Sequence, residues 1–297
     1  MSAATPTSWL VTGARGQLGH DLREVLARRP DDRLTAVGRA EVDLTDEAAV
    51  RATVRDWLAA ADGRRPVLVN AAAYTAVDAA EDDEDTARVV NGDAPGWLAQ
   101  ELAGRGRLVH VSTDYVFDGS ATAPYPVDAP VAPRSAYGRT KAAGEQAIAA
   151  VGGDATVVRT AWVYGRHGGN FVRTMTDLEA RRDTVSVVDD QVGSPTWSAD
   201  LAAGLVEIGA REESSPPVLH CTNSGQVSWF GLARAVFEEL GADPERVLPT
   251  TSEAFVRPAP RPAYSVLDGS AWTAAGLTAP QPWRTALHAA MAEGFRG

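Results

Sequence analysis

Cysteine and long apolar runs are both scarce in this sequence. The 297 residues include one cysteine, Cys221, so no disulfide can form within the chain, and a reducing compartment is expected. No apolar run approaches the length of a membrane-spanning helix, and residues 1–8 lack the charged and apolar regions of a signal peptide. We therefore expect a cytoplasmic protein with no membrane partner, in which Cys221 is an inert core residue.

Positive charge is also in short supply. Lysine and arginine together number 28 against 39 aspartates and glutamates, which gives a formal net charge of −11 at pH 7. No basic tract or stripe is present, so we expect no nucleic-acid partner. The histidines show no metal-ligand spacing and none pairs with the cysteine, so no metal site is expected. The length suits one large α/β domain, or one domain with a smaller appendage.

Glycines follow the first apolar run of the chain. Residues 9–12 are typical of a strand, and the next seven residues have the spacing G-x-x-G-x-x-G before a helical pattern begins. A strand, a glycine turn and a helix form the opening of a dinucleotide-binding fold. Gly13 would permit the tight turn, Gly16 the approach of a pyrophosphate, and Gly19 the close packing of helix and strand. A glycine turn without a ligand is the alternative.

A second strand is predicted over residues 33–37, and the residues that follow it indicate which cofactor is preferred. Folds that bind NAD usually carry an acidic residue there for the ribose 2′-hydroxyl. Arg39 is placed to meet a 2′-phosphate instead, which favours NADPH and leaves NADH possible. A surface arginine without a ligand is the alternative. Asp43 could accept from the adenine amine, or Asp43 or Asp46 could cap a helix predicted over 47–60.

Strand-like runs alternate with helical segments across the first 160 residues. This alternation predicts a Rossmann-type, doubly wound α/β fold with a parallel sheet and helices on both of its faces. Ligands of such sheets bind beyond the carboxyl ends of the strands. The residues expected at that edge are Gly13, Gly38, Ala72, Thr113 and Trp162.

The second half is more irregular. Helices are predicted over 171–182, 199–208, 230–240 and 283–295, with strands near 185–188 and 218–221 and dense proline between 244 and 282. We predict an NAD(P)-binding Rossmann domain over 1–165 that includes the catalytic helix. Residues 166–297 are predicted to form mainly a smaller substrate-binding lobe, some segments of which return to the first domain.

A tyrosine and a lysine stand four residues apart at Tyr137 and Lys141, downstream of a strand that ends near Thr113. On a helix such a pair shares one face. The ammonium could then favour the phenolate and lower the tyrosine pKa from about 10. A hydroxyl, a tuned phenol and a lysine make a carbonyl-reduction site once a hydride donor is bound, although Tyr137 alone could be an ordinary tyrosine. His110, inside the apolar run, is expected to be structural.

Several of these motifs together resemble the dTDP-4-dehydrorhamnose reductase family, extended short-chain reductases that act on nucleotide sugars. The resemblance extends from about Trp9 to the C-terminus. The Asn-Ala-Ala-Ala and Asp-Gln-x-Gly-x-Pro-Thr runs are the more specific to this group. The runs that carry it are 13–19, 70–78, 112–117, 137–141, 159–164, 190–196 and 261–262.

This resemblance implies hydride transfer from NAD(P)H to the C4 ketone of a dTDP-bound 6-deoxy-4-ketohexose. Tyr137 would donate the proton, Lys141 would hold the nicotinamide ribose, and Thr113 would hydrogen-bond the reacting oxygen. The implied cofactor contacts include the motif glycines, Arg39, Tyr137 and Lys141. The others are Gln17, Leu18, Asp43, Leu44, Ala72, Ala73 and Tyr74. The implied substrate contacts are Thr113, Asp114, Trp162 (which could instead be a core residue), Asn170 and, for the phosphates, Arg261 (or its neighbour Arg257).

Two departures from the family pattern matter. Asp21 and Ala199 stand where some members carry glutamates that hold a dimer-bridging magnesium ion, so no such bridge is expected and the chain could be a monomer or a homodimer. The second departure is Arg39, which replaces the acidic residue of members that use NADH readily. Neither departure involves the catalytic group.

The simplest expected product is dTDP-L-rhamnose, but two alternatives stay open. The chain could be a related dTDP-ketosugar reductase of antibiotic-sugar biosynthesis, as in dihydrostreptose formation. It could also be a non-catalytic, NADP-binding regulatory subunit of the methionine adenosyltransferase type, which shares the fold and binds a partner protein. The presence of Thr113, Tyr137 and Lys141 favours an enzyme, and turnover would decide.

Overall fold

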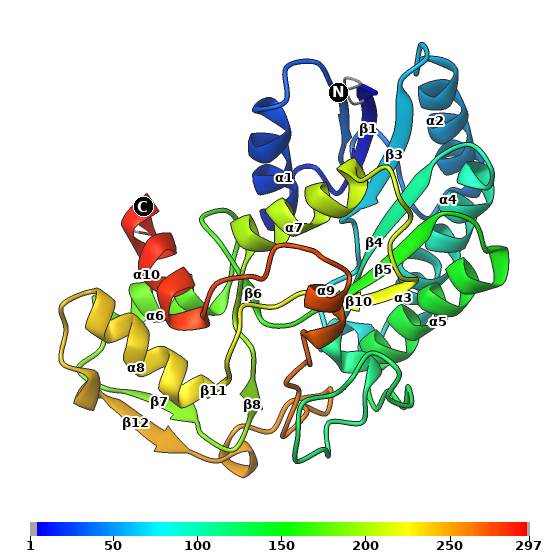
Figure 1. Cartoon of the computed structure of the whole chain (residues 1–297). Coiled ribbons are helices and arrows are strands. Elements are labelled where there is room, and N and C mark those ends of the chain that lie inside the picture. The colour runs from blue at the N-terminus through cyan, green and yellow to red at the C-terminus, as the bar shows by residue number, and fades with distance from the viewer. Residues whose placement is uncertain (1–4, 296–297) are drawn as a thin grey trace.

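A six-stranded parallel sheet forms the core of the larger part of the molecule in the computed structural model, which describes residues 5–295 (Figure 1). Its strand order is β10-β5-β4-β3-β1-β2. Strand β2 lies on one side of β1, and β3 and the strands after it lie on the other side. The strand order therefore reverses between β1 and β3, and sheets of this kind bind their ligands at this switch point. The strands are β1 Thr7–Thr12, β2 Arg33–Val37, β3 Arg65–Asn70, β4 Arg107–Thr113, β5 Ala155–Thr160 and β10 Val218–His220.

Helices cover both faces of this sheet, which confirms the predicted doubly wound α/β architecture. On one face Trp9, Val67 and Leu205 belong to one apolar cluster, and on the other face Leu10, Leu68 and Ile148 belong to a second. The first face is covered by α1 Gln17–Ala27, α7 Ser198–Ala210 and α9 Ser270–Ala274. The second is covered by α2 Glu47–Ala59, α4 Ala94–Leu102 and α5 Ala136–Val151.

Segments from the second half of the chain therefore complete the sheet domain. Strand β10 pairs with β5, and α7 and α9 pack on the same face as α1. Because these elements follow residue 165, the sheet domain is discontinuous in sequence. Within residues 5–295, no helix has the length and apolar character needed to cross a membrane.

The helical segment between β3 and β4 is interrupted. It consists of α3 Glu84–Arg88, a π-helical turn Val89–Asp93 and α4. The turn coincides with Asn91, whose side chain accepts from the N–H of Tyr74 at 2.8 Å and donates to its carbonyl oxygen at 3.1 Å. The wider turn thereby holds the loop that follows β3 at the ligand-binding edge.

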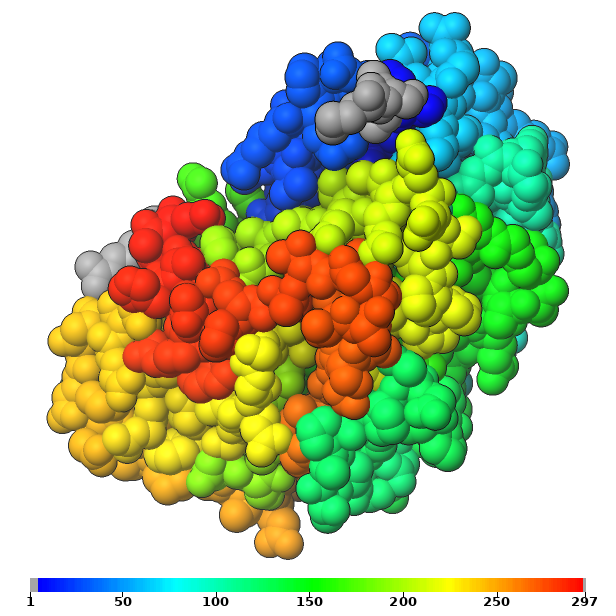
Figure 2. All heavy atoms as spheres, in the orientation of Figure 1, coloured from blue at the N-terminus to red at the C-terminus, as the bar shows by residue number. Residues whose placement is uncertain are grey.

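The remaining elements form a smaller lobe with its own core, which includes Tyr164, Val172, Phe237 and Leu287. Its helices are α6 Phe171–Glu179, α8 Trp229–Glu239 and α10 Trp283–Gly294, and its strand pairs are β7 Val185–Val188 with β12 Val247–Thr250, β8 Val192–Gly193 with β11 Val227–Ser228, and β6 Val163–Tyr164 with β9 Thr196–Trp197. The orange and red C-terminal segments lie across the junction between lobe and sheet on the face shown in Figure 2. Short helical turns occur at η1 Ala79–Glu81, η3 Asp114–Val116, η4 Pro244–Arg246 and η5 Ser252–Ala254.

Candidate active site

The glycine-rich loop connects β1 to α1 at the switch point of the sheet. Gly13 has a φ of +68°, and a Cβ there would lie 2.7 Å from the backbone nitrogen of Ala72, so only glycine fits. Gly16 is the N-cap of α1, and no side chain caps that end. The first N–H groups of α1 are therefore available to an anion, which suits the pyrophosphate of a dinucleotide.

The loop after β3 faces the glycine loop. The strand ends at Asn70 because its side-chain oxygen accepts from the Ala72 N–H at 3.3 Å, which turns the chain out of the sheet. Residues 71–73 therefore belong to the loop and not to the strand. Ala72, Ala73 and Tyr74 lie at the edge expected for cofactor contacts.

An acidic side chain that the sequence reasoning missed lies in the turn that follows β2. Glu41 accepts from the backbone N–H of Gly38 at 2.8 Å and forms an ion pair with Arg15 of the glycine loop. Its signal in the sequence is an acidic residue three positions after a glycine that ends a strand. Arg39 is exposed close to Glu41 in the chain.

The start of α2 is capped by Asp46 and not by Asp43. The Asp46 side chain accepts from the N–H of Ala49 at 3.0 Å.

Thr113 and Tyr137 are brought together by direct contact of two backbone turns. Thr113 is the last residue of β4, and Tyr137 lies in the first turn of α5, whose N-cap Ser135 accepts from the N–H of Gly138 at 3.1 Å. A Cβ on Gly138 would lie only 2.2 Å from the carbonyl oxygen of Tyr115. The helix start therefore packs onto η3 without a side chain between them, and the Thr113 hydroxyl hydrogen-bonds the Tyr137 phenol.

The prediction that Lys141 lowers the pKa of Tyr137 is wrong for this structure. Enclosure of the phenol, with a smaller contribution from the charge of Asp114, raises the pKa of Tyr137 to about 12. Lys141 does not offset the burial, because its Nζ donates to the carbonyl oxygen of Val111 at 2.6 Å. Burial lowers the pKa of Lys141 to about 8.

Asp114 lies beneath this group and is 3% exposed. Its Oδ1 accepts from the Thr113 hydroxyl at 2.9 Å, while its Oδ2 has no hydrogen-bond partner within residues 5–295. Burial raises the pKa of Asp114 to about 6, and the hydrogen bond from Thr113 counteracts part of that rise. An unpaired buried carboxylate oxygen suits contact with a bound hydroxyl.

The other residues expected near the substrate come from the junction with the lobe. Trp162 has a φ of +48°, rare for a bulky residue, and its ring stacks on Trp229 with centroids 3.5 Å apart. Asn170 caps α6 through the N–H of Arg173 and donates to Gln17 Oε1 at 2.8 Å, so it joins the lobe to the glycine loop. Trp229 was not anticipated from the sequence.

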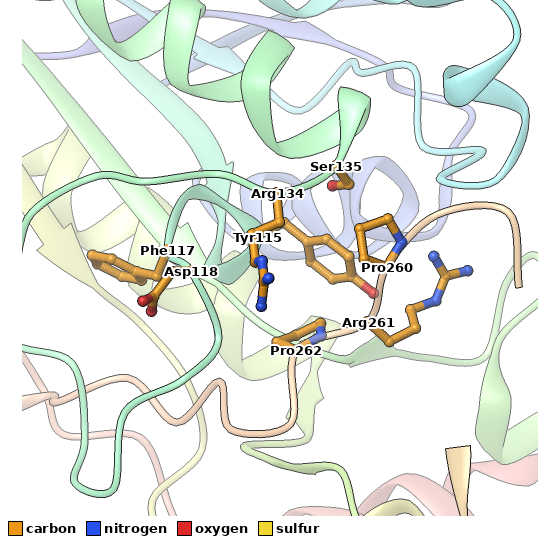
Figure 3. Close-up of a pocket in the computed structure, with 8 residues that line it drawn as sticks. All are labelled: Tyr115, Phe117, Asp118, Arg134, Ser135, Pro260, Arg261 and Pro262. Atoms are coloured by element: carbon orange, nitrogen blue, oxygen red, sulfur yellow. The ribbon is translucent and has the colours of Figure 1, made fainter. Parts of the chain in front are cut away.

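Arg261 lines a pocket beside Tyr115, together with Arg134 and Pro260 (Figure 3). Its guanidinium points away from most of the lining residues and forms an ion pair with Asp78 at 2.9 Å. The segment that carries it is thereby tied to the loop after β3. A phosphate that binds Arg261 would therefore compete with the Asp78 carboxylate for the guanidinium.

Asp21, one of the two positions at which the sequence departs from the family pattern, lies on α1. Asp21 is 8% exposed, and burial raises its pKa. In the part of the chain that the structure describes, no three histidine, cysteine, aspartate or glutamate side chains gather closely enough to hold a metal ion.

Comparison with known proteins identifies the family. The family model described as "RmlD substrate binding domain" matches residues 7–295. The chain is 51% identical over 284 residues to a probable dTDP-4,6-dihydroxy-2-methyloxan-3-one 4-ketoreductase of Streptomyces antibioticus, covering 95% of this chain and 94% of that protein. It is also 51% identical over 292 residues to the dTDP-4-dehydrorhamnose reductase of Streptomyces griseus, covering 97% and 94%.

Solved structures agree with these sequence relationships. The dTDP-4-dehydrorhamnose reductase of Bacillus anthracis in complex with NADP superposes with a TM-score of 0.90 at 33% identity, over 97% of this chain and 99% of that one. A corresponding protein from Clostridium acetobutylicum gives a TM-score of 0.89 at 36% identity, with the same coverage. The chain therefore belongs to the RmlD, or dTDP-4-dehydrorhamnose reductase, family of extended short-chain reductases.

Proposed function

We propose that this chain is an NADPH-dependent reductase of a dTDP-linked 4-keto-6-deoxyhexose. The observation that carries the proposal is the meeting of Thr113, Tyr137 and Lys141 at the sheet edge onto which the glycine loop opens. The identities with ketosugar reductases support the substrate class. The NADP in the Bacillus anthracis relative supports the cofactor, and NADH stays possible.

In the proposed mechanism, NADPH held by the glycine loop and Lys141 would, when bound, be the source of the hydride for the ketone carbon. Tyr137 donates its proton to the oxygen that becomes the alkoxide, and its pKa of about 12 ensures that the phenol still carries that proton at neutral pH. Thr113 orients the phenol and the reacting oxygen through its hydroxyl. Lys141 holds the ribose next to the nicotinamide and stabilises the phenolate that remains.

Cofactor contacts are proposed along the carboxyl ends of β1, β2 and β3. The uncapped start of α1 would hold the pyrophosphate, and Arg39 the 2′-phosphate. Glu41 and Arg15, paired next to Gly38, would form the wall beside the adenosine ribose. The full proposed set is Gly13, Gly16, Gln17, Leu18, Gly19, Arg39, Asp43, Leu44, Ala72, Ala73, Tyr74, Tyr137 and Lys141.

Substrate contacts are proposed for Thr113, Asp114, Trp162, Asn170 and Arg261, between the sheet and the lobe. The sheet and lobe would then act as an NAD(P)-binding domain over 1–165 and a substrate-binding region over 166–297, with β10, α7 and α9 contributed back to the first. A cytoplasmic location, and a monomer or a homodimer, are part of the same proposal.

The test is NADPH consumption with dTDP-4-keto-6-deoxy-L-mannose, followed by the stereochemistry of the product. A second substrate, dTDP-4-keto-6-deoxy-D-glucose, belongs in the same assay because relatives of nearly equal identity carry different substrate names. Turnover of either ketosugar supports the reductase, and their kcat/KM ratio assigns the sugar. Tight NADPH binding with no turnover of any dTDP-ketosugar would instead favour the non-catalytic regulatory subunit.

A further inference from the structure

A row of buried polar side chains crosses the sheet beneath Lys141. Thr12, Asn70 and His110 are register partners on β1, β3 and β4, so their side chains lie on the same face of the sheet. None is more than 2% exposed. The preceding residues of these strands on that face are leucines in the apolar cluster that α5 covers. A polar row in such surroundings has to be satisfied by hydrogen bonds among its own members.

The contacts at the Thr12 end of the row determine how the Asn70 amide is oriented, and with it which atom of each later pair donates. The side-chain oxygen of Asn70 accepts from the Thr12 hydroxyl at 2.6 Å and from the Ala72 N–H at 3.3 Å. A backbone N–H can only donate, so the amide nitrogen of Asn70 is the atom that faces His110 Nδ1, at 2.9 Å. Nδ1 then has to accept, and a neutral imidazole carries its single proton on Nε2. Complete burial keeps the pKa of His110 well below its ordinary value, so the ring is neutral.

Nε2 of this ring lies 3.4 Å from Nζ of Lys141. An ammonium group has only donors, whereas a neutral amine has a lone pair that can accept from Nε2–H. The N–H of His110 therefore disfavours the charged form of the lysine, and it acts in the same direction as burial, which brings the lysine pKa to about 8.

Other charged groups near α5 are engaged elsewhere. Glu145 favours the charged lysine, but the guanidinium of Arg159 holds its carboxylate at 2.7 Å. Several acidic groups on elements packed against the helix have partners of their own: Glu81 with the N–H of Ala136, Glu84 with Arg139, Asp93 with Arg88, Glu101 with Arg55, and Asp114 with Thr113. His110 is thus the polar side chain of the sheet that faces the amine.

We propose that His110, held by Asn70 with its proton on Nε2, is a positioning residue that favours the neutral form of the Lys141 amine. The inference rests on the catalytic role proposed for Lys141. Asn70 and His110 thereby let the lysine change its charge within the pH range in which a cytoplasmic enzyme works, and they connect the first strand to the catalytic helix.

The chain offers an unusually direct measurement, because Lys141 is its only lysine. Protein labelled with ε-¹⁵N-lysine gives a single side-chain signal, whose titration reports the pKa of Lys141 without any turnover. His110→Leu removes the N–H and should raise that pKa by about one unit. Asn70→Asp should raise it as well, because the new carboxylate accepts from Nδ1–H and leaves the lone pair of Nε2 facing the amine. An unchanged pKa in both variants would overturn the proposal.

His220→Leu is the matched control. His220 is also a buried neutral histidine of this sheet, but its Nε2 faces Arg159 at 3.4 Å. The pKa of Lys141 should stay unchanged in this variant. An equal rise in His110→Leu and His220→Leu would point to general loosening of the core and would contradict the role of His110.

The position of the imidazole proton is the second readout. Long-range ¹H–¹⁵N spectra of histidine-labelled protein should show the His110 proton on Nε2 in the natural chain and on Nδ1 in Asn70→Asp. A proton on Nδ1 in the natural chain would overturn the proposal even if His110→Leu fails to fold. Neither readout uses the ketosugar, so a chain without reductase activity would contradict the proposed function separately.

Discussion

The hydroxyl of Thr113 donates a hydrogen bond to the carboxylate of Asp114, 2.9 Å away, in a place where that carboxylate is almost fully buried. An ionised Asp114 can only accept, so it draws the Thr113 proton toward itself. The other lone pairs of Thr113 then remain for the N–H of Tyr115 and the phenol of Tyr137. The charge of Asp114 thus helps to orient the catalytic hydroxyl.

Asp114→Asn is expected to stabilise the protein at pH 7.5 and not at pH 4. Because the pKa of Asp114 rises from 3.8 to about 6 on folding, the folded chain binds the proton more tightly, and the ionised carboxylate lowers stability as the pH rises through this window. The asparagine has no such cost, so the free energy of unfolding should exceed that of the natural chain by about 1–3 kcal/mol above pH 6. Urea unfolding at several pH values measures this. A stability difference that does not vary between pH 4 and pH 7.5 would contradict it.

Tyr137→Phe should lower kcat by about 10² or more, because general acid catalysis is lost. NADPH binding, measured by calorimetry, should stay nearly intact. Thr176→Val, a buried threonine of α6 whose hydroxyl bonds only the carbonyl of Val172, provides a control for a lost buried hydroxyl. Normal turnover in Tyr137→Phe would remove this residue from the mechanism.

The pH dependence of the natural enzyme should be governed by Lys141 at the alkaline end. Its pKa is about 8, so the ammonium is present below that pH and is lost as the pH rises through it. The phenol of Tyr137, with a pKa of about 12, keeps its proton throughout. We expect kcat/KM to fall by about tenfold per pH unit above pH 8. Constant kcat/KM up to pH 10 would show that the ammonium is not required.

Arg39→Ala should weaken NADPH more than NADH, by about 1.5–3 kcal/mol for a hydrogen bond to a charged group. Arg33→Ala is the control, because Arg33 lies on β2, the strand that precedes Arg39, is exposed, and donates to the carbonyl of Ala60. Dissociation constants for both cofactors measure the effect. Equal losses for NADPH and NADH would refute a 2′-phosphate contact and direct attention to Arg15.

Gly138→Ala should lower both stability and kcat. The added methyl would lie 2.2 Å from the carbonyl oxygen of Tyr115, so the start of α5 has to move away from η3 and carries Tyr137 with it. Gly169→Ala adds the same methyl where no atom lies within 4 Å and should change neither. Thermal unfolding and steady-state kinetics of the two variants test this, and equal behaviour would argue against the close contact.

The sequence alone was sufficient for the architecture and for most of the edge at which the site lies. Periodic apolar residues, the glycine spacing and the Tyr-x-x-x-Lys pair depend on neighbours only a few residues apart, and such local patterns predict strands, turns and helix faces well. For the same reason, β2 and the strand at 185–188 match their predicted bounds.

Only the tertiary structure decided the chemistry of the side chains. The high pKa of Tyr137 comes from enclosure, the orientation of Lys141 from a carbonyl on β4, and the hydrogen-bond row from residues 58 and 40 positions apart in the chain. Glu41 reaches Gly38 through a turn, and Trp229 reaches Trp162 from the lobe. Charge and hydrogen bonding depend on which groups are near in space and how much water is excluded, and neither is set by sequence neighbours.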